Sequence, residues 1–204
     1  MNAYLIIFIL LFFSITLSFL ELFDYRNNDN YVGDLYPKSQ DCTLFKKMVW
    51  YFSQVTYQIQ LLLAIYFGMR LLGYKNDIFY KMIAAPSLLV SVQYFLLLNP
   101  KIKLKDLHKF TYCNIISHLF NSLIILMELK SIKTFRFIEA FYCFPIIIIS
   151  LLIIQYNYSI RKIWTYNLLN IKTKLGKKKL LSSISMTLLL SLILMFIHKN
   201  INII

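Results

Sequence analysis

The chain has 204 residues, enough for one domain with a sizeable core, and 59% of them are hydrophobic. Soluble domains are about 45–50% apolar, so the composition excludes an ordinary soluble protein and indicates a membrane protein. The formal net charge of +13 would also suit nucleic-acid binding. Because lysines and arginines gather in the loops of membrane proteins, we expect the bilayer as partner and no nucleic acid.

Six stretches of the sequence contain no Asp, Glu, Lys or Arg, and each is at least 18 residues long. A helix needs roughly 20 apolar residues to cross a hydrocarbon core of about 30 Å. We therefore predict an all-α fold, an integral membrane bundle of about six transmembrane helices that forms a single domain over residues 1–204. The expected spans are residues 2–23, 48–70, 80–99, 108–128, 137–160 and 179–198.

An even number of spans would bring both termini to the same side of the membrane. Most lysines and arginines fall in the first, third and fifth loops, so the positive-inside rule predicts these loops in the cytosol. The first span lacks a basic start and a small-residue cleavage site, which favours a retained helix over a signal peptide. We expect a multi-pass integral membrane protein, and the sequence leaves its membrane open between the endoplasmic reticulum and the plasma membrane.

Between the first two spans, residues 24–47 carry four aspartates. The ligand spacing of an EF-hand is absent there, so we interpret the segment as a solvated loop rather than a calcium site. Cys42, Cys113 and Cys143 show neither paired nor metal-ligand spacing. We expect no metal and no cofactor.

Along the second span, Ser53, Thr56 and Gln60 follow an i, i+3, i+7 pattern on one helical face. The third span contains Pro86 close to its predicted start, where a missing N–H costs least. Pro145 lies inside the fifth span and predicts a kink there.

The fourth span has a polar face inside a stretch without charge. Thr111, Asn114, His118 and the pair Asn121/Ser122 recur at helical spacing. A polar row in a spanning helix cannot face lipid cheaply, so it should point into the bundle or a wet cavity.

The second and fourth spans are separated by one complete crossing and should run parallel. Thr56 and His118 then lie at depths of roughly 12 and 15 Å, at 1.5 Å per residue. If the two polar faces meet, the pair could act as nucleophile and base in acyl transfer, with Asn114 orienting the ring or supporting an oxyanion. The alternative is that His118 and Asn114 only hydrogen-bond between helices.

Two local sequence patterns resemble those of a known family. Val55-Thr56-Tyr57 is followed by an apolar run that closes with Phe67-Gly68, and Asn114-x-x-x-His118 is followed by Glu128. In this, the sequence resembles the family of androgen-induced and androgen-dependent tissue-factor-pathway-inhibitor-regulating proteins. These are multi-pass membrane threonine hydrolases of fatty acid esters of hydroxy fatty acids. The resemblance implies Thr56 as the nucleophile and His118 as the catalytic histidine.

The sequence departs from that family at several positions. Ile115 replaces a second histidine after the asparagine, and Ile59 replaces an acidic or amide residue three positions after the threonine. The family's histidine pair before a Trp-x-Tyr element is absent, with Tyr158 and Ser159 nearby. Because the family has these residues, their replacement is expected to affect the range of substrates and the activity itself.

The sequence thus predicts an intramembrane lipid ester hydrolase with Thr56 and His118 as catalytic residues, Asn114 in support and a lipid ester as substrate. The alternatives are a catalytically inactive family member that acts as a membrane scaffold or regulator, and a small transporter. A transporter is disfavoured because only His118 is ionisable at depth and no inverted repeat is visible. Asn157-Tyr-Ser159 is a formal glycosylation sequon that we expect to be unused beside the membrane.

Overall fold

The computed structural model describes residues 2–24, 43–95, 109–162, 164–165 and 170–201, with the backbone alone at 21–24 and 109–117. Every regular element in these residues is helical, which confirms the predicted all-α class. The elements are α1 (Ala3–Asp24), α2 (Leu44–Ser53), α3 (Val55–Leu71), α4 (Asp77–Gln93), α5 (Lys109–Leu129), the 3₁₀ helix η3 (Phe137–Cys143), α6 (Phe144–Arg161) and α7 (Lys174–Ile201). The predicted aspartate-rich loop lies mostly outside the described residues.

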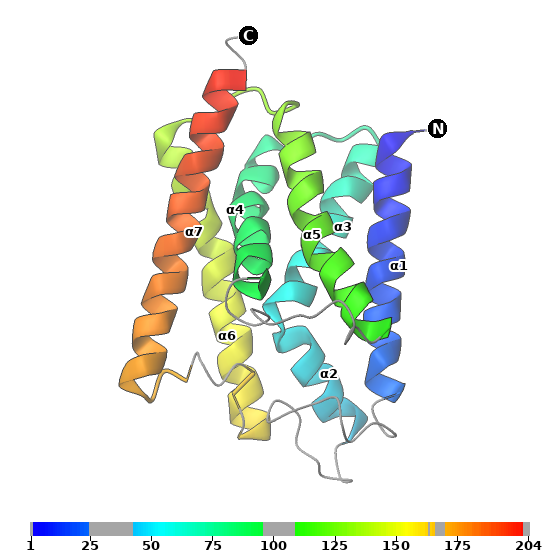
Figure 1. Ribbon diagram of the computed structural model, residues 1–204, viewed down its shortest axis with the longest axis vertical. Helices are drawn as coiled ribbons and strands as arrows, with labels where there is room; N and C mark the ends of the chain where they lie inside the picture. Colours follow the sequence, from blue (N-terminus) through cyan, green and yellow to red (C-terminus); the bar gives the residue numbers. More distant parts are fainter. Residues whose placement is uncertain (1, 25–42, 96–108, 163, 166–169, 202–204) are drawn as a thin grey trace.

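The helices form an elongated bundle in which the start of α1 and the end of α7 lie at the same end (Figure 1). α1 packs on α3, and α4 packs on α5, α7 and η3. Among the described residues, three segments are long and apolar enough to cross a membrane: Ala3–Leu20, Phe137–Arg161 and Lys174–Ile201. The buried core lies where α3, α4 and α5 meet and includes Tyr66, Tyr80, Ile83 and Ile125.

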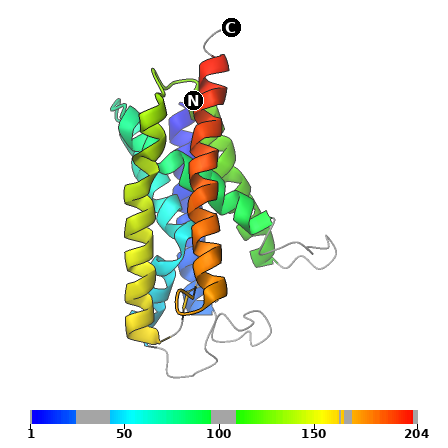
Figure 2. The ribbon, with the colours of Figure 1, turned by 90° about the vertical axis from the view of Figure 1, so that its left-hand side faces the viewer.

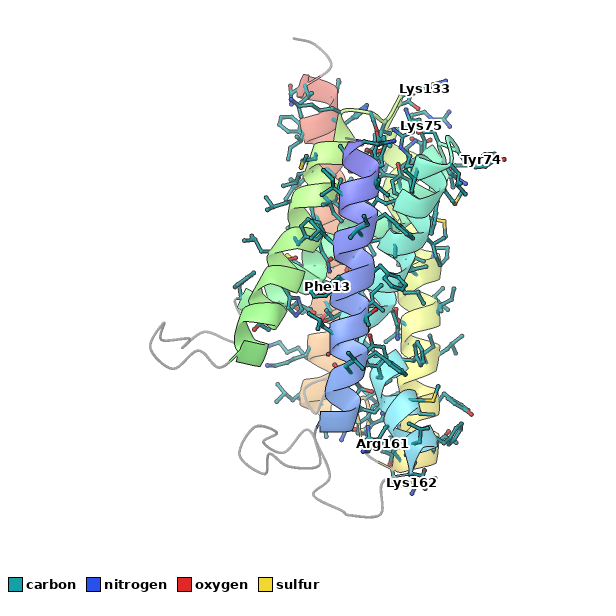
Figure 3. All side chains as sticks on the ribbon, turned by 90° about the vertical axis from the view of Figure 1, so that its right-hand side faces the viewer. Phe13, Tyr74, Lys75, Lys133, Arg161 and Lys162 are labelled. Carbon is teal, nitrogen blue, oxygen red and sulfur yellow. The ribbon has the colours of Figure 1, made fainter. Side chains whose placement is uncertain are left out.

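The outer surface of the bundle is apolar along its length. Phe13 on α1 points outward at 59% exposure, whereas Lys75 and Lys133 lie at one end and Arg161 and Lys162 at the other (Figure 3). This distribution is the one that a bilayer stabilises, with charges at the headgroups and apolar side chains between them. The described helices are therefore compatible with a membrane protein.

The predicted second span is not one continuous helix, because the chain is extended at Gln54 (φ −74°, ψ 118°) and divides into α2 and α3. Side chains satisfy backbone carbonyls that the break frees. Ser53 Oγ donates to the Trp50 carbonyl at 2.6 Å, and Gln58 Nε2 donates to the Phe52 carbonyl at 2.8 Å. No proline or glycine announces this break, so hydropathy could not reveal it.

The two prolines occupy positions other than those predicted. α4 begins at Asp77, where Asn76 Oδ1 caps the Phe79 N–H at 2.9 Å, so Pro86 lies inside the helix rather than near its start. Pro145 lies in the first turn of α6 and is preceded by η3, so it starts a helix and does not kink one. A proline is tolerated at such a start because its missing N–H has no partner to lose.

The turn before α7 is closed around a glycine. Thr173 Oγ1 accepts a hydrogen bond from the Gly176 N–H at 2.9 Å, and a Cβ at position 176 would overlap the carbonyl oxygen of Asn170. We therefore expect Gly176→Ala to lower the free energy of unfolding by about 1–3 kcal/mol, as overpacking does. Detergent-titration unfolding should detect this loss, whereas the exposed neighbour variant Lys177→Ala should match wild type. Equal stability of the two variants would contradict the close approach.

Candidate functional site

Thr56 is the second residue of α3, directly after the break at Gln54, and is half-buried. The first N–H groups of a helix have no intrahelical acceptor and carry partial positive charge. The break thus moves Thr56 from the middle of a predicted helix to a helix N-terminus. A negative charge that develops beside its hydroxyl would be stabilised there.

His118 is buried on α5, and its contacts are with α4. Its ring stacks on Tyr94, with centroids 3.9 Å apart and planes 13° apart, and its backbone carbonyl accepts a hydrogen bond from Ser91 Oγ. Nδ1 of the ring has no hydrogen-bond partner among the described residues.

Within the described residues, no hydrogen bond joins Thr56 to His118. The side chain of Asn114, the predicted supporting residue, lies outside the described part. α5 is tilted, and its first turns lie away from the other helices (Figures 2 and 3). The structure thus brings the histidine against Tyr94 of α4 and leaves the predicted contact with Thr56 unmade.

The register between α3 and α5 is nevertheless defined by a contact further along both helices. Tyr66 O–H donates to Glu128 Oε1 at 2.8 Å, and the helices run in the same direction (Figure 1). Thr56 precedes Tyr66 by ten residues, and His118 precedes Glu128 by ten. At 1.5 Å per residue, both lie about 15 Å from the contact, so they share a depth.

Glu128 is the centre of a buried polar cluster that sequence reasoning did not assign. Its Oε1 receives Ser131 Oγ at 2.7 Å and lies 2.8 Å from Arg70 Nε. Arg70 also donates to the Tyr4 hydroxyl and lies over that ring, with Cζ 4.6 Å from its centroid. The cluster ties α1, α3 and α5 together near one end of the bundle. The signal in the sequence was an acidic residue directly after an apolar span, with an arginine at the end of another.

The residues of the polar face predicted on the fourth span point toward two different helices in the structure. His118 faces α4, as its ring contact shows. Asn121 lies seven residues before Glu128, nearly two helical turns, so it shares the side of α5 that faces α3. Its side chain is fully buried, and neither amide atom has a hydrogen-bond partner in the part of the chain that the structure describes.

Other polar side chains link helices in pairs. Gln60 on α3 donates to Ser14 on α1 at 3.2 Å. This residue of the polar row predicted on the second span thus contacts α1. Similar bonds join α6 to α3 and α4 to α7: Ser150 to Gln58 at 2.6 Å, and Gln93 to Ser183 at 2.7 Å. Such pairs stabilise packing between apolar helices.

No family model, curated protein or solved structure matches the chain. In the described part of the chain, no group of three or more His, Cys, Asp and Glu residues could hold a metal ion. The candidate site therefore rests on the geometry of α3, α4 and α5.

Asn157 of the formal sequon is fully buried in a hydrogen-bonded chain. It donates to Thr165 Oγ1 at 2.9 Å, which in turn donates to Ser53 Oγ at 2.7 Å. We expect no glycan on Asn157, because its amide is inaccessible in the folded bundle. Glycosidase treatment of protein expressed in eukaryotic cells should leave its electrophoretic mobility unchanged, and a shift lost in Asn157→Gln would contradict this burial.

Proposed function

We propose that the chain is a multi-pass integral membrane protein of about six spans that hydrolyses lipid esters. The chain passes along the same bundle in α1, α2–α3, α4, α5, η3–α6 and α7, in alternating directions (Figure 1). Leu119, Leu123 and Leu126 are exposed on α5, as expected of a lipid-facing surface. The same helix buries His118 and Asn121 on its inner side.

The observation that carries the proposal is the common depth of Thr56 and His118, derived from the Tyr66–Glu128 contact. In the proposed reaction, the Thr56 hydroxyl attacks the ester carbonyl while Nδ1 of His118 accepts its proton. The imidazolium returns the proton to the leaving alcohol oxygen as the ester bond breaks. Water then attacks the acyl-threonine, again with the histidine as base, and the fatty acid leaves.

This chemistry requires the imidazole to exchange its stacking on Tyr94 for contact with Thr56. We propose that a bound ester drives this change by bringing the first half of α5 toward α3. In the reacting tautomer, Nε2 carries the proton of the neutral ring, and the first turn of α3 would stabilise the oxyanion. The substrate class, fatty acid esters of hydroxy fatty acids, follows from the family resemblance at these residues.

The test is ester hydrolysis by the purified protein in lipid nanodiscs, with the palmitoyl ester of 12-hydroxystearic acid as substrate. We expect release of palmitate above the rate in empty nanodiscs. If palmitate release does not exceed that background, the proposed hydrolase activity is contradicted.

A catalytically inactive membrane scaffold is the second candidate. The observation that favours it is the stacking of His118 on Tyr94, which is also what a histidine that only joins α4 to α5 would do. A scaffold would show no turnover in the same assay. Its His118→Ala variant would be less stable than the wild type, with no activity to lose.

A further inference from the structure

Asn121 is a buried polar side chain on α5 without a hydrogen-bond partner among the described residues. It is 0% exposed, and this holds for both its amide nitrogen and its amide oxygen. An unsatisfied buried donor or acceptor is costly, and most buried polar groups are bonded. A leucine of similar size would be cheaper at this position if packing were its only role.

The surroundings of Asn121 indicate what could bind there. Since Asn121 shares a side of α5 with Glu128, it lies about two turns from the Tyr66 contact, level with Ile59 of α3. Ile59, Leu63 and Ile124 are buried in the hydrophobic core to which α3 and α5 contribute, and the charge of Glu128 is already matched by Arg70. An apolar site with one neutral amide suits an uncharged polar group carried on a hydrocarbon chain.

We propose that the Asn121 amide is the contact that recognises the ester group of a lipid ligand between α3 and α5. This inference rests on the proposed function and names the residue that selects its substrate. The amide N–H donates to the ester carbonyl oxygen, and the amide oxygen accepts from the hydroxyl of the alcohol released by hydrolysis. His118, one turn earlier on the same helix, also has an Nδ1 without a hydrogen-bond partner among the described residues.

Binding can be measured apart from turnover in the Thr56→Ala background. The full chain in nanodiscs is photolabelled with a diazirine-bearing palmitoyl ester of 12-hydroxystearic acid. Two unlabelled competitors are compared: the same ester, and the matching ether in which CH₂ replaces the carbonyl. We expect the ester to compete at least about tenfold better, the worth of one good hydrogen bond to a buried polar group.

Asn121→Leu and Asn121→Ala should abolish this preference, so that ester and ether compete equally. The ligand-free Asn121→Leu protein should also melt higher than its parent, by roughly 3 °C, because it no longer buries an unsatisfied amide. The control variant Ser122→Ala should keep both the preference and the melting temperature. A merely structural role for Asn121 would give the opposite shift, a lower melting temperature.

The inference is overturned if the Thr56→Ala protein does not prefer ester over ether, if Asn121→Leu keeps the preference, or if Asn121→Leu melts lower. Its failure is distinct from failure of the hydrolase. If the wild type hydrolyses the ester and Asn121→Leu keeps the preference for ester, the hydrolase proposal stands and ester recognition by Asn121 is contradicted. If the preference depends on Asn121 but the wild type shows no turnover, ester recognition by Asn121 is supported and the hydrolase proposal is contradicted.

Discussion

Thr56→Ala is expected to abolish ester turnover, because the variant has no hydroxyl to form the acyl intermediate. His118→Ala should lower kcat by about 10²–10⁴-fold, the usual contribution of a positioned general base. The fold of both variants should persist, since Thr56 is only half-buried and His118→Ala leaves the backbone bond to Ser91 in place. Initial rates of palmitate release in nanodiscs measure both effects.

The matched control is Thr16→Ala on α1, whose hydroxyl only bonds back to the Phe12 carbonyl at 2.9 Å. This variant should turn over the ester as the wild type does. Thr56→Ser should retain part of the activity because it keeps an alcohol nucleophile. Full activity in Thr56→Ala, or a parallel loss in Thr16→Ala, would contradict the assignment of the nucleophile.

Glu128→Ala is expected to destabilise the protein by about 3–5 kcal/mol, the usual cost of breaking a buried ion pair. The carboxylate is 5% exposed and is held by Tyr66, Ser131 and Arg70, so its removal leaves a half-buried guanidinium without its counter-charge. Because the same contact joins α3 to α5, the variant should lose ester turnover as well. Unfolding in mixed micelles and nanodisc kinetics measure the two losses.

The double variant Arg70→Met with Glu128→Leu separates charge from packing. It leaves no unpaired charge, and apolar replacement of a buried ion pair is often neutral or stabilising. We therefore expect it to recover most of the stability that Glu128→Ala loses. Lys130→Ala, an exposed neighbour, should stay within about 0.5 kcal/mol of wild type. If Glu128→Ala were as stable as Lys130→Ala, the cluster would not hold α5.

Helix positions could be predicted from the sequence because a membrane span requires a long uncharged run, and within the described residues these runs are helical except at Asn2 and Gln54. The ends and breaks could not be predicted in this way. α4 starts at Asp77 because Asn76 caps it, a local hydrogen bond that hydropathy does not include. The break at Gln54 depends on bonds from Ser53 and Gln58 to backbone carbonyls, which form only in the folded chain.

For the candidate site, the sequence predicts position along a helix but not direction around it. Thr56 and His118 each precede a partner of the Tyr66–Glu128 contact by ten residues, about 15 Å along their own helices. His118 and Asn121 differ by only about 60° around α5, so a helical face drawn from sequence includes both. Which of them faces α3 depends on the tilt of α5 and on the ring of Tyr94, which no local pattern encodes.

In the proposed mechanism, Thr56 and His118 form one reactive centre between α3 and α5. The most direct measurement is to treat the nanodisc-embedded protein with a fluorophosphonate probe and to locate the adduct by mass spectrometry of its peptides. The proposed mechanism predicts an adduct on Thr56 that disappears in His118→Ala. An adduct on another residue, or one on Thr56 that forms equally well without His118, would contradict it.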